Sequence, residues 1–288
     1  MIPSVLLVDK PKGLTSSKIV ENLRKRFKVK AGHTGTLDPM ATGLLILLLN
    51  EATRYAEFFI RLPKEYVAVA KLGEIRDTYD AEGKVLEKIQ VNASCEDVKK
   101  VLKSFLGKIS QLPPPYSAKR VEGRRAYDLA RRGIKVNLKS VEVEVFKAEL
   151  LECKIPQLKL LFCVSSGTYI RSLVNDIGLK LGCGAYVEEL RRIKIGSFDV
   201  NMAIAYERLM SITDIYGVAI PIWEALNFLP AVRLDVRNAE RIKKGLPVTL
   251  LSCSERRTFV RLFDDEKFIG VGVADGKWLK AYRLLPQT

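Results

Sequence analysis

The residues best placed for chemistry lie in one loop, Gly32–Gly43, with the sequence GHTGTLDPMATG. The loop holds Asp38, and His33, the only histidine of the chain, precedes it by five residues. Glycines let a backbone approach a ligand closely, and loops on rigid scaffolds commonly carry function. A single carboxylate in such a loop can act as a nucleophile or a general base. The alternative is an Asx turn in front of Pro39, and spacing alone does not separate the two.

A catalytic carboxylate needs a cation nearby to stay ionised and oriented, and Arg171 is the candidate. It ends the segment Ser165–Arg171 (SSGTYIR), at the start of a helix predicted over 168–181. The alternative is a solvated helix residue, which the sequence taken alone favours. Considered singly, the residues indicate a chemistry but do not fix it.

The charge balance points to a polyanionic partner. The 288 residues include 48 Lys and Arg against 33 Asp and Glu, a net charge of +15. Lys and Arg supply the affinity for phosphate, so this excess is typical of proteins that bind nucleic acid. A thermophile-like surface rich in both signs explains many charges but not the imbalance. One basic run contains Lys119, Arg120, Arg124, Arg125, Arg131 and Arg132.

The five cysteines predict neither a disulfide framework nor a metal site. They are scattered, odd in number and never spaced as CxxC: Cys95, Cys153, Cys163, Cys183 and Cys253. We expect buried free thiols in a reducing compartment. We expect no signal peptide, because no basic segment followed by an apolar one opens the sequence. The longest apolar run, Leu44–Leu49, is far shorter than a membrane span. A cytoplasmic protein without membrane contact is expected.

Hydrophobic periodicity predicts strands and helices in mixed order. Strands are expected over 4–8, 44–49, 66–72, 141–146, 158–164 and 193–198. Helices are expected over 52–59, 96–105 and 168–181, and a further helix is expected to begin at a cap on Ser16 or Ser17. Residues 30–40 are expected to form a loop. The lack of a regular βαβ rhythm favours an α+β fold over a doubly wound sheet.

Two domains are expected. Residues 1–229 would form the larger of the two. After Pro230 the chain changes to short segments, and residues 230–288 suffice for a small β-rich module. The module carries 12 basic and 7 acidic residues, and the rest of the chain is also basic. Both parts can therefore contact the same polyanion.

Several short motifs, taken together, indicate a family. In chain order they are Lys10–Gly13 (KPKG), Gly32–Asp38 (GHTGTLD), Glu65–Tyr66 (EY), Leu72–Gly73 (LG), Gly167–Arg171 (GTYIR) and Leu190–Arg192 (LRR). The chain resembles the TruB family of tRNA pseudouridine synthases, and Pro113–Lys119 (PPPYSAK) resembles its bacterial branch. The resemblance spans about residues 4–200. It implies that residues 1–229 form a catalytic domain on a mixed, mainly antiparallel sheet, with an RNA-binding insertion at about 107–140. The tail from Pro230 is similar to the family's β-barrel-like PUA-type module in size and place. Arg76 is a departure, because many members carry Thr there.

The resemblance implies an isomerase that converts uridine 55 in the T loop of tRNA to pseudouridine. Such an enzyme breaks the N-glycosidic bond, rotates the base and rejoins it through carbon, without metal or organic cofactor. The base is stacked in the folded T loop, so it must be flipped out. Asp38 is implied as the nucleophile and Arg171 as its ion-pair partner. Tyr66 is implied as the stacking face for the flipped base and a candidate base for the final proton removal.

Further residues are implied to bind RNA or to support the site. His33 would fill the gap that the extruded base leaves, and Lys10 and Pro11 would brace the catalytic loop. Asp80 lies in a matching acidic turn, for which a structural role is expected. The implied substrate-binding set is His33, Lys10, Lys119, Arg124, Arg125 and Arg131. Packing alone is the alternative for Lys10 and Pro11, as it is for Tyr66, an aromatic residue in a strand.

Two rival functions remain at this point. One is the guide-RNA-dependent sister branch, which uses the same catalytic core inside a protein–RNA particle. The length of the insertion around Tyr116–Lys119 (YSAK) argues against it. The other is a non-catalytic chaperone that binds, refolds and releases tRNA, and it would need no intact set of Asp38, Tyr66 and Arg171. The expected partner is the T stem-loop of tRNA, with no obligate protein partner.

Overall fold

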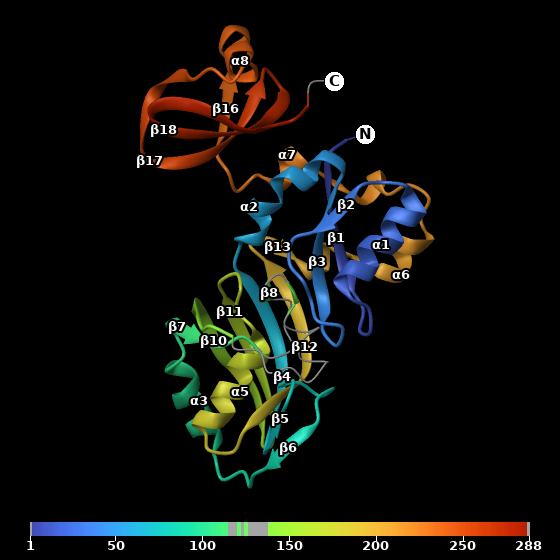
Figure 1. Cartoon of the computed structure of the whole chain (residues 1–288), viewed down its shortest axis with the longest axis vertical. Coiled ribbons are helices and arrows are strands. Elements are labelled where there is room, and N and C mark those ends of the chain that lie inside the picture. Colours follow the sequence, from blue (N-terminus) through green and yellow to red (C-terminus); the bar gives the residue numbers. More distant parts are fainter. Residues whose placement is uncertain (1, 115–119, 122–123, 126–137, 287–288) are drawn as a thin grey trace.

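A computed structural model of the chain describes residues 2–114, 120–121, 124–125 and 138–286 (Figure 1). Among these, eleven strands form one mixed sheet whose main path runs β14-β1-β3-β12-β4-β11-β10-β7. The pairs β1–β14 and β3–β12 are parallel, and the other neighbours on this path are antiparallel. The mixed, mainly antiparallel sheet expected for an α+β fold is confirmed.

The strands of the large sheet are β1 (Ser4–Lys10), β2 (Ala31–His33), β3 (Thr42–Leu49), β4 (Lys64–Leu72), β7 (Gly107–Gln111), β10 (Val141–Lys154), β11 (Gln157–Val164), β12 (Ala185–Ile195), β13 (Phe198–Asp199), β14 (Ile204–Ala205) and β15 (Ile220–Pro221). Two short ladders lie outside it, β5 (Glu74–Arg76) with β6 (Val85–Lys88), and β8 (Arg120–Val121) with β9 (Arg124–Arg125). The α-helices up to residue 229 are α1 (Ser16–Phe27), α2 (Ala56–Ile60), α3 (Cys95–Lys103), α5 (Ile170–Lys180), α6 (Tyr206–Ser211) and α7 (Ile222–Ala225). The 3-10 helices are η1 (Asn50–Tyr55), η2 (Val200–Met202) and η3 (Tyr216–Val218). None of the described helices is long and apolar enough to cross a membrane.

The apolar run of β3 is continuous because both faces of this strand are covered. The even-numbered residues of Leu44–Leu49 pack with Phe59 of α2, and the odd-numbered ones pack with Ile19 and Leu23 of α1. A strand that is buried on both faces has no polar face to alternate with. The strand expected here from the sequence is confirmed as an interior strand of the sheet.

Further along the sheet, the described helices α3 and α5 cover one face. Residues of β4 alternate between buried and half-buried, and α3 and α5 pack over the buried face through Val98, Leu102, Leu173 and Ile177. This part of the sheet is joined to β3 by a very short parallel contact of β12, in which Arg192 pairs with Gly43. A Cβ atom on Gly43 (φ +103°) would lie 2.2 Å from the Arg192 carbonyl oxygen, so this contact requires glycine.

The C-terminal residues form a second, three-stranded sheet of β16 (Ala231–Leu234), β17 (Val248–Asp264) and β18 (Lys267–Leu284), accompanied by α8 (Val236–Lys243). The two long strands curl around their own apolar core (Figure 1), as expected for the small β-rich module. The module packs on α2, where the rings of Phe58 and Phe259 lie 5.1 Å apart and the Tyr282 hydroxyl donates to Glu57 at 2.9 Å. The exact division at residue 229 stays a prediction.

Several expected element boundaries were wrong, among them the following three. The cap of α1 is Thr15, whose hydroxyl accepts from the Lys18 N–H at 3.0 Å, and not Ser16 or Ser17. The expected loop 30–40 begins with β2, which pairs with β3. Of the strand expected over 193–198, residues 193–195 are the end of β12, which starts eight residues earlier, at Ala185, and Phe198 begins β13. Pairing with neighbouring strands decides the last two boundaries, and local sequence does not report it.

The expectation of free thiols was wrong for one pair. Cys95 at the start of α3 and Cys153 near the end of β10 form a disulfide, with their Cα atoms 6.0 Å apart. Among the described side chains, Cys163 and Cys183 are free. The two bonded cysteines are 58 residues apart, and only the packing of α3 against β10 brings them together.

Candidate active site

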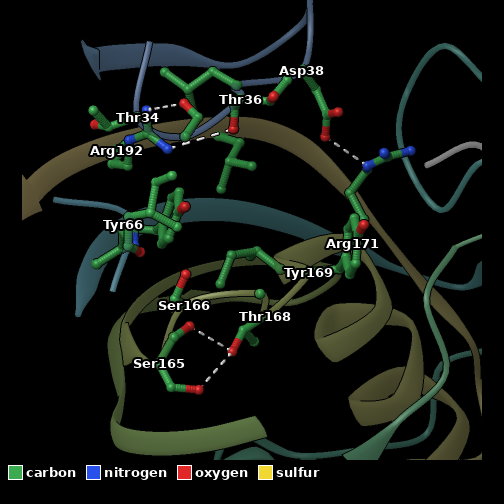
Figure 2. Close-up of a pocket in the computed structure, with 17 residues that line it drawn as sticks. Thr34, Thr36, Asp38, Tyr66, Ser165, Ser166, Thr168, Tyr169, Arg171 and Arg192 are labelled. Atoms are coloured by element: carbon green, nitrogen blue, oxygen red, sulfur yellow. Dashed lines mark hydrogen bonds and ion pairs between the residues drawn. The ribbon is translucent and has the colours of Figure 1, made fainter. Parts of the chain in front are cut away.

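The loop after β2, the strand β4 and the N-terminus of α5 enclose a cavity of about 230 Å³ (Figure 2). Its walls bring together Asp38, Tyr66 and Arg171, the three catalytic residues expected from the sequence. Pockets for drug-sized ligands commonly measure about 300–1,000 Å³. A smaller cavity with an aromatic side and a charged side suits a single flat, polar ring.

The loop that carries Asp38 is fixed by backbone and hydroxyl contacts. The Ser16 hydroxyl accepts from the Leu37 N–H at 2.9 Å, and the Gly13 N–H donates to the Pro39 carbonyl at 2.8 Å. The Ala41 N–H donates to the Asp38 carbonyl at 3.1 Å. The backbone on both sides of Asp38 is therefore held, while 35% of its side chain stays exposed toward the cavity.

Arg171 connects Asp38 to a second carboxylate. Its Nε lies 2.9 Å from Asp38 Oδ2, and its Nη1 lies 3.1 Å from Asp80 Oδ2. Nη1 also donates to the Thr78 carbonyl at 2.9 Å. The side chains of Arg171 and Asp80 are only 5% and 6% exposed. The two carboxylates hold the guanidinium in place, and their negative charges compensate its buried positive charge.

The turn that presents Asp80 is itself well anchored. The Thr78 hydroxyl donates to Asp80 Oδ1 at 2.6 Å, and the Ala81 N–H donates to the Val187 carbonyl of β12 at 2.9 Å. Arg76, the departure from the family pattern, spans the turn and donates to the Ala81 carbonyl at 2.9 Å. Asp80, expected to be structural, lies in direct contact with Arg171 and thus helps to orient it.

Tyr66 lies across the pocket from the Asp38–Arg171 pair (Figure 2). It is on β4, its ring is largely buried, and the Arg192 guanidinium lies 6.0 Å from its ring centre. Arg192 is buried and donates to the Leu44 carbonyl at 2.7 Å and to the Gly35 carbonyl at 3.0 Å. It therefore ties β12 to the catalytic loop. Arg192 belongs to the Leu190–Arg192 motif but was not among the residues expected in the site.

Two lysines near the cavity, Lys10 and Lys64, are buried. Lys10 is fully buried, and its ammonium donates to the carbonyls of Pro11, Leu14 and Pro39. Burial lowers the pKa of Lys10 to about 8, against the opposing effect of Asp38. These contacts support the expected brace of the loop. The Lys10 side chain has no exposed surface in this structure, and its expected contact with substrate stays a prediction.

Lys64 was not singled out from the sequence. It lies two residues before Tyr66, on the same face of β4, and lines the cavity. Its ammonium donates to the carbonyls of Ile60 and Leu62. Burial, and secondarily Arg192, lower the pKa of Lys64 to about 8. The strand period of two places both residues in the pocket, and this signal was available in the sequence.

The expected RNA-binding residues lie apart from the cavity or beyond the described chain. His33 ends β2 and is half-buried, one residue before the cavity wall begins at Thr34. Lys119 and Arg131 lie outside the described residues, and of Arg124 and Arg125 only the backbone, in β9, is described. In the described part of the chain, no three His, Cys, Asp or Glu side chains are grouped to hold a metal ion.

Models of one protein family match most of the chain. The model described as TruB family pseudouridylate synthase (N terminal domain) matches residues 23–170. A tRNA pseudouridylate synthase B C-terminal domain matches 171–217, and a Pseudouridine synthase II TruB, C-terminal model matches 230–285. The matched ranges contain Asp38, Tyr66, Asp80 and Arg171.

Individual proteins agree with these matches. The chain is 46% identical to a tRNA pseudouridine synthase B of Aquifex aeolicus (strain VF5), over 97% of this chain and 98% of that protein. It is 38% identical to the protein of the same name of Clostridium tetani (strain Massachusetts / E88), over 98% and 99%. A chain in an H/ACA RNP bound to a substrate RNA containing 2'-deoxyuridine superposes with a TM-score of 0.74 and 25% identity, over 98% and 85%. A chain in a Cbf5-Nop10-Gar1 complex superposes with a TM-score of 0.74 and 27% sequence identity, over 95% of this chain and 79% of that chain.

Proposed function

Because the chain belongs to the TruB family of pseudouridine synthases, we propose that it converts uridine 55 in the T loop of tRNA to pseudouridine, with Asp38 as the nucleophile. The chain is a tRNA pseudouridine synthase, an isomerase, since relatives of that name match it from end to end. The observation that carries the catalytic proposal is the pairing of a buried Arg171 with an Asp38 that opens toward the cavity.

The geometry supports a division of labour within the cavity. Arg171 places its positive charge 2.9 Å from Asp38 and orients it, so the carboxylate can attack the flipped nucleotide. Tyr66 offers its ring as the stacking face for the base. The N-glycosidic bond breaks, the base rotates, and a carbon of the base bonds to the same ribose while the bond to Asp38 breaks and frees the carboxylate. The nitrogen released from the ribose takes up a proton. The proton displaced from that carbon leaves to a base, for which Tyr66 is our candidate.

Binding of the rest of the tRNA is assigned to surfaces outside the cavity. His33 would occupy the gap left by the extruded base, and the basic residues Lys119, Arg124, Arg125 and Arg131 would contact the RNA backbone. The positively charged C-terminal module would add to these contacts. A protein with this substrate acts where tRNA matures, in the cytoplasm, and needs no obligate protein partner.

The guide-RNA-dependent branch is the first rival. The solved H/ACA chains share the fold at 25–27% identity, whereas tRNA pseudouridine synthases B reach 46% with nearly full coverage of both proteins. Sequence identity therefore favours a stand-alone enzyme. Purified protein incubated with a tRNA transcript and no guide RNA decides between them, because the rival would leave that transcript unmodified.

The proposal as a whole is tested by mapping pseudouridine in a tRNA transcript after incubation with the wild type and with Asp38→Asn. We expect modification at position 55 alone with the wild type. The variant should bind the same tRNA but lose turnover almost completely, because an amide cannot act as the nucleophile. A variant that keeps a tenth of the wild-type rate would refute the role of Asp38.

A tRNA-folding chaperone is the second rival. Such a protein would refold tRNA without the chemistry, and the same role can also accompany catalysis. Refolding of a misfolded transcript by wild type and by Asp38→Ala measures it independently of modification. Equal refolding without any pseudouridine in the wild-type reaction would favour the chaperone.

A further inference from the structure

Gln111, at the end of β7, is fully buried and forms a paired contact with the backbone of one residue. Its Oε1 accepts from the Tyr169 N–H at 2.8 Å, and its Nε2 donates to the Tyr169 carbonyl at 3.0 Å. Both polar groups of the amide are therefore hydrogen-bonded to the backbone of one residue. Hydrogen bonds at both ends of the amide offset the free-energy cost of burying it. They also fix the position of the backbone that the amide contacts.

The contacted residue is the cap position of α5, the helix that carries Arg171. Tyr169 is the N-cap of α5, and no side chain of its own caps the helix. The first N–H groups of a helix lack partners within the helix, so they are satisfied from elsewhere. Gln111 anchors the backbone at this point, two residues before Arg171. Four consecutive residues here, 168–171, line the cavity.

Neighbouring contacts hold the same segment on both sides. The Ser172 hydroxyl donates to the Leu112 carbonyl at 2.8 Å, directly after Gln111 in the sequence. At the other end, the Ser165 N–H donates to the Glu144 carbonyl, and the Glu144 N–H donates to the Ser165 hydroxyl, both at 2.8 Å. Contacts from the end of β7 and the start of β10 therefore hold residues 165–172 at both ends, and residues 165–171 form one wall of the cavity.

We propose that Gln111 is a positioning residue for the reaction, which fixes the first turn of α5 so that the Arg171 guanidinium meets Asp38. The inference rests on the proposed roles of Asp38 and Arg171. It extends them to a residue that does not line the cavity. Small shifts of an orienting group are costly in catalysis, since a displacement of about 1 Å can reduce a rate about 100-fold.

The first test is Gln111→Leu, which fills a similar space without hydrogen bonds. We expect the single-turnover rate at saturating tRNA to fall by about 10- to 100-fold, with the dissociation constant for tRNA changed less than about twofold. Tyr206→Phe is the matched control, because it deletes a hydrogen bond to Asn22 far from the cavity. The control should keep its rate. A Gln111→Leu rate within twofold of the wild type would overturn the proposal.

Gln111→Glu tests the hydrogen bonds themselves and does not depend on the folding of the leucine variant. A protonated carboxyl has one donor and one acceptor and can reproduce both contacts to Tyr169, whereas a carboxylate faces the Tyr169 carbonyl with a like partial charge. The rate of this variant relative to wild type at the same pH should therefore rise as the pH falls. A relative rate that is reduced and independent of pH would contradict the role of the paired contact.

The final arm separates this inference from the proposed function. In an Arg171→Ala background, Gln111→Leu should reduce the single-turnover rate by less than about twofold, because the guanidinium that Gln111 positions is gone. The same loss in both backgrounds would show that Gln111 acts independently of Arg171. If Asp38→Asn retains turnover, the proposed catalytic function fails instead, whatever Gln111 does.

Discussion

Arg171 Nε and Asp38 Oδ2 lie 2.9 Å apart, and the two side chains differ sharply in exposure, 5% for the arginine and 35% for the aspartate. The cation is buried and fixed by other partners, while the carboxylate faces the cavity. This asymmetry suits a nucleophile, because one carboxylate oxygen can reach the substrate while the other is paired with the arginine.

Arg171→Ala should abolish most turnover even when tRNA is saturating, because Asp38 loses its orienting partner. It should also lower the free energy of unfolding by about 3–5 kcal/mol, since Asp80 is left buried without its cation. Single-turnover kinetics and urea unfolding measure the two effects. Asp80→Asn is the matched variant: its amide can keep the contact to Arg171 through oxygen, so both losses should be smaller. An Asp80→Asn variant as damaged as Arg171→Ala would contradict this hierarchy.

Replacing Arg124 and Arg125 together by alanine should weaken tRNA binding without changing the rate at saturating tRNA. If each arginine contacts one phosphate, each loss should flatten the log–log salt dependence of binding by about 0.7–0.9. Binding measured across a salt series gives the slope. An unchanged slope would mean that the basic run is a solvated surface, the alternative considered for it.

The lowered pKa of Lys64 predicts a pH-dependent stability. Its pKa is about 8 in the folded protein against an ordinary value of 10.5. Between these values the unfolded chain binds more protons than the folded one, so the free energy of unfolding rises with pH. Relative to Lys64→Met, the wild type should gain about 3 kcal/mol from pH 7 to pH 10.5. Chemical unfolding at several pH values measures the difference, and a constant difference would refute the burial effect.

The disulfide between Cys95 and Cys153 should contribute to stability and not to catalysis, because neither cysteine lines the cavity. Closing a loop of 58 residues is worth about 4 kcal/mol in the chain-entropy account. Replacing both cysteines by serine should lower the free energy of unfolding by about that amount and leave the single-turnover rate intact. A reductant should destabilise the wild type and have no effect on the double variant. Equal responses of both proteins would show that the bond does not persist in solution.

Local patterns gave much of the fold. The apolar run of β3, the alternation of β4 and the amphipathic α1 each follow from a period that a short segment carries by itself. The motifs around Asp38, Tyr66 and Arg171 also indicated the family before any contact was known. Long-range pairings were beyond such patterns. The start of β12 at Ala185 depends on its pairing with β4, and the disulfide depends on how α3 lies against β10.

What the sequence by itself determined is the chemistry on offer: a lone aspartate in a glycine-rich loop, a strand tyrosine, a helix arginine and a large positive charge. Tertiary structure alone decided which of them cooperate. It placed Asp80 against Arg171, brought Arg192 to the catalytic loop, buried Lys10, and bonded Gln111 to the cap of α5. The physical reason is that segments distant in sequence decide how deeply a side chain is buried and which groups it contacts. Residue types and their spacing can be read from a short stretch of the chain alone.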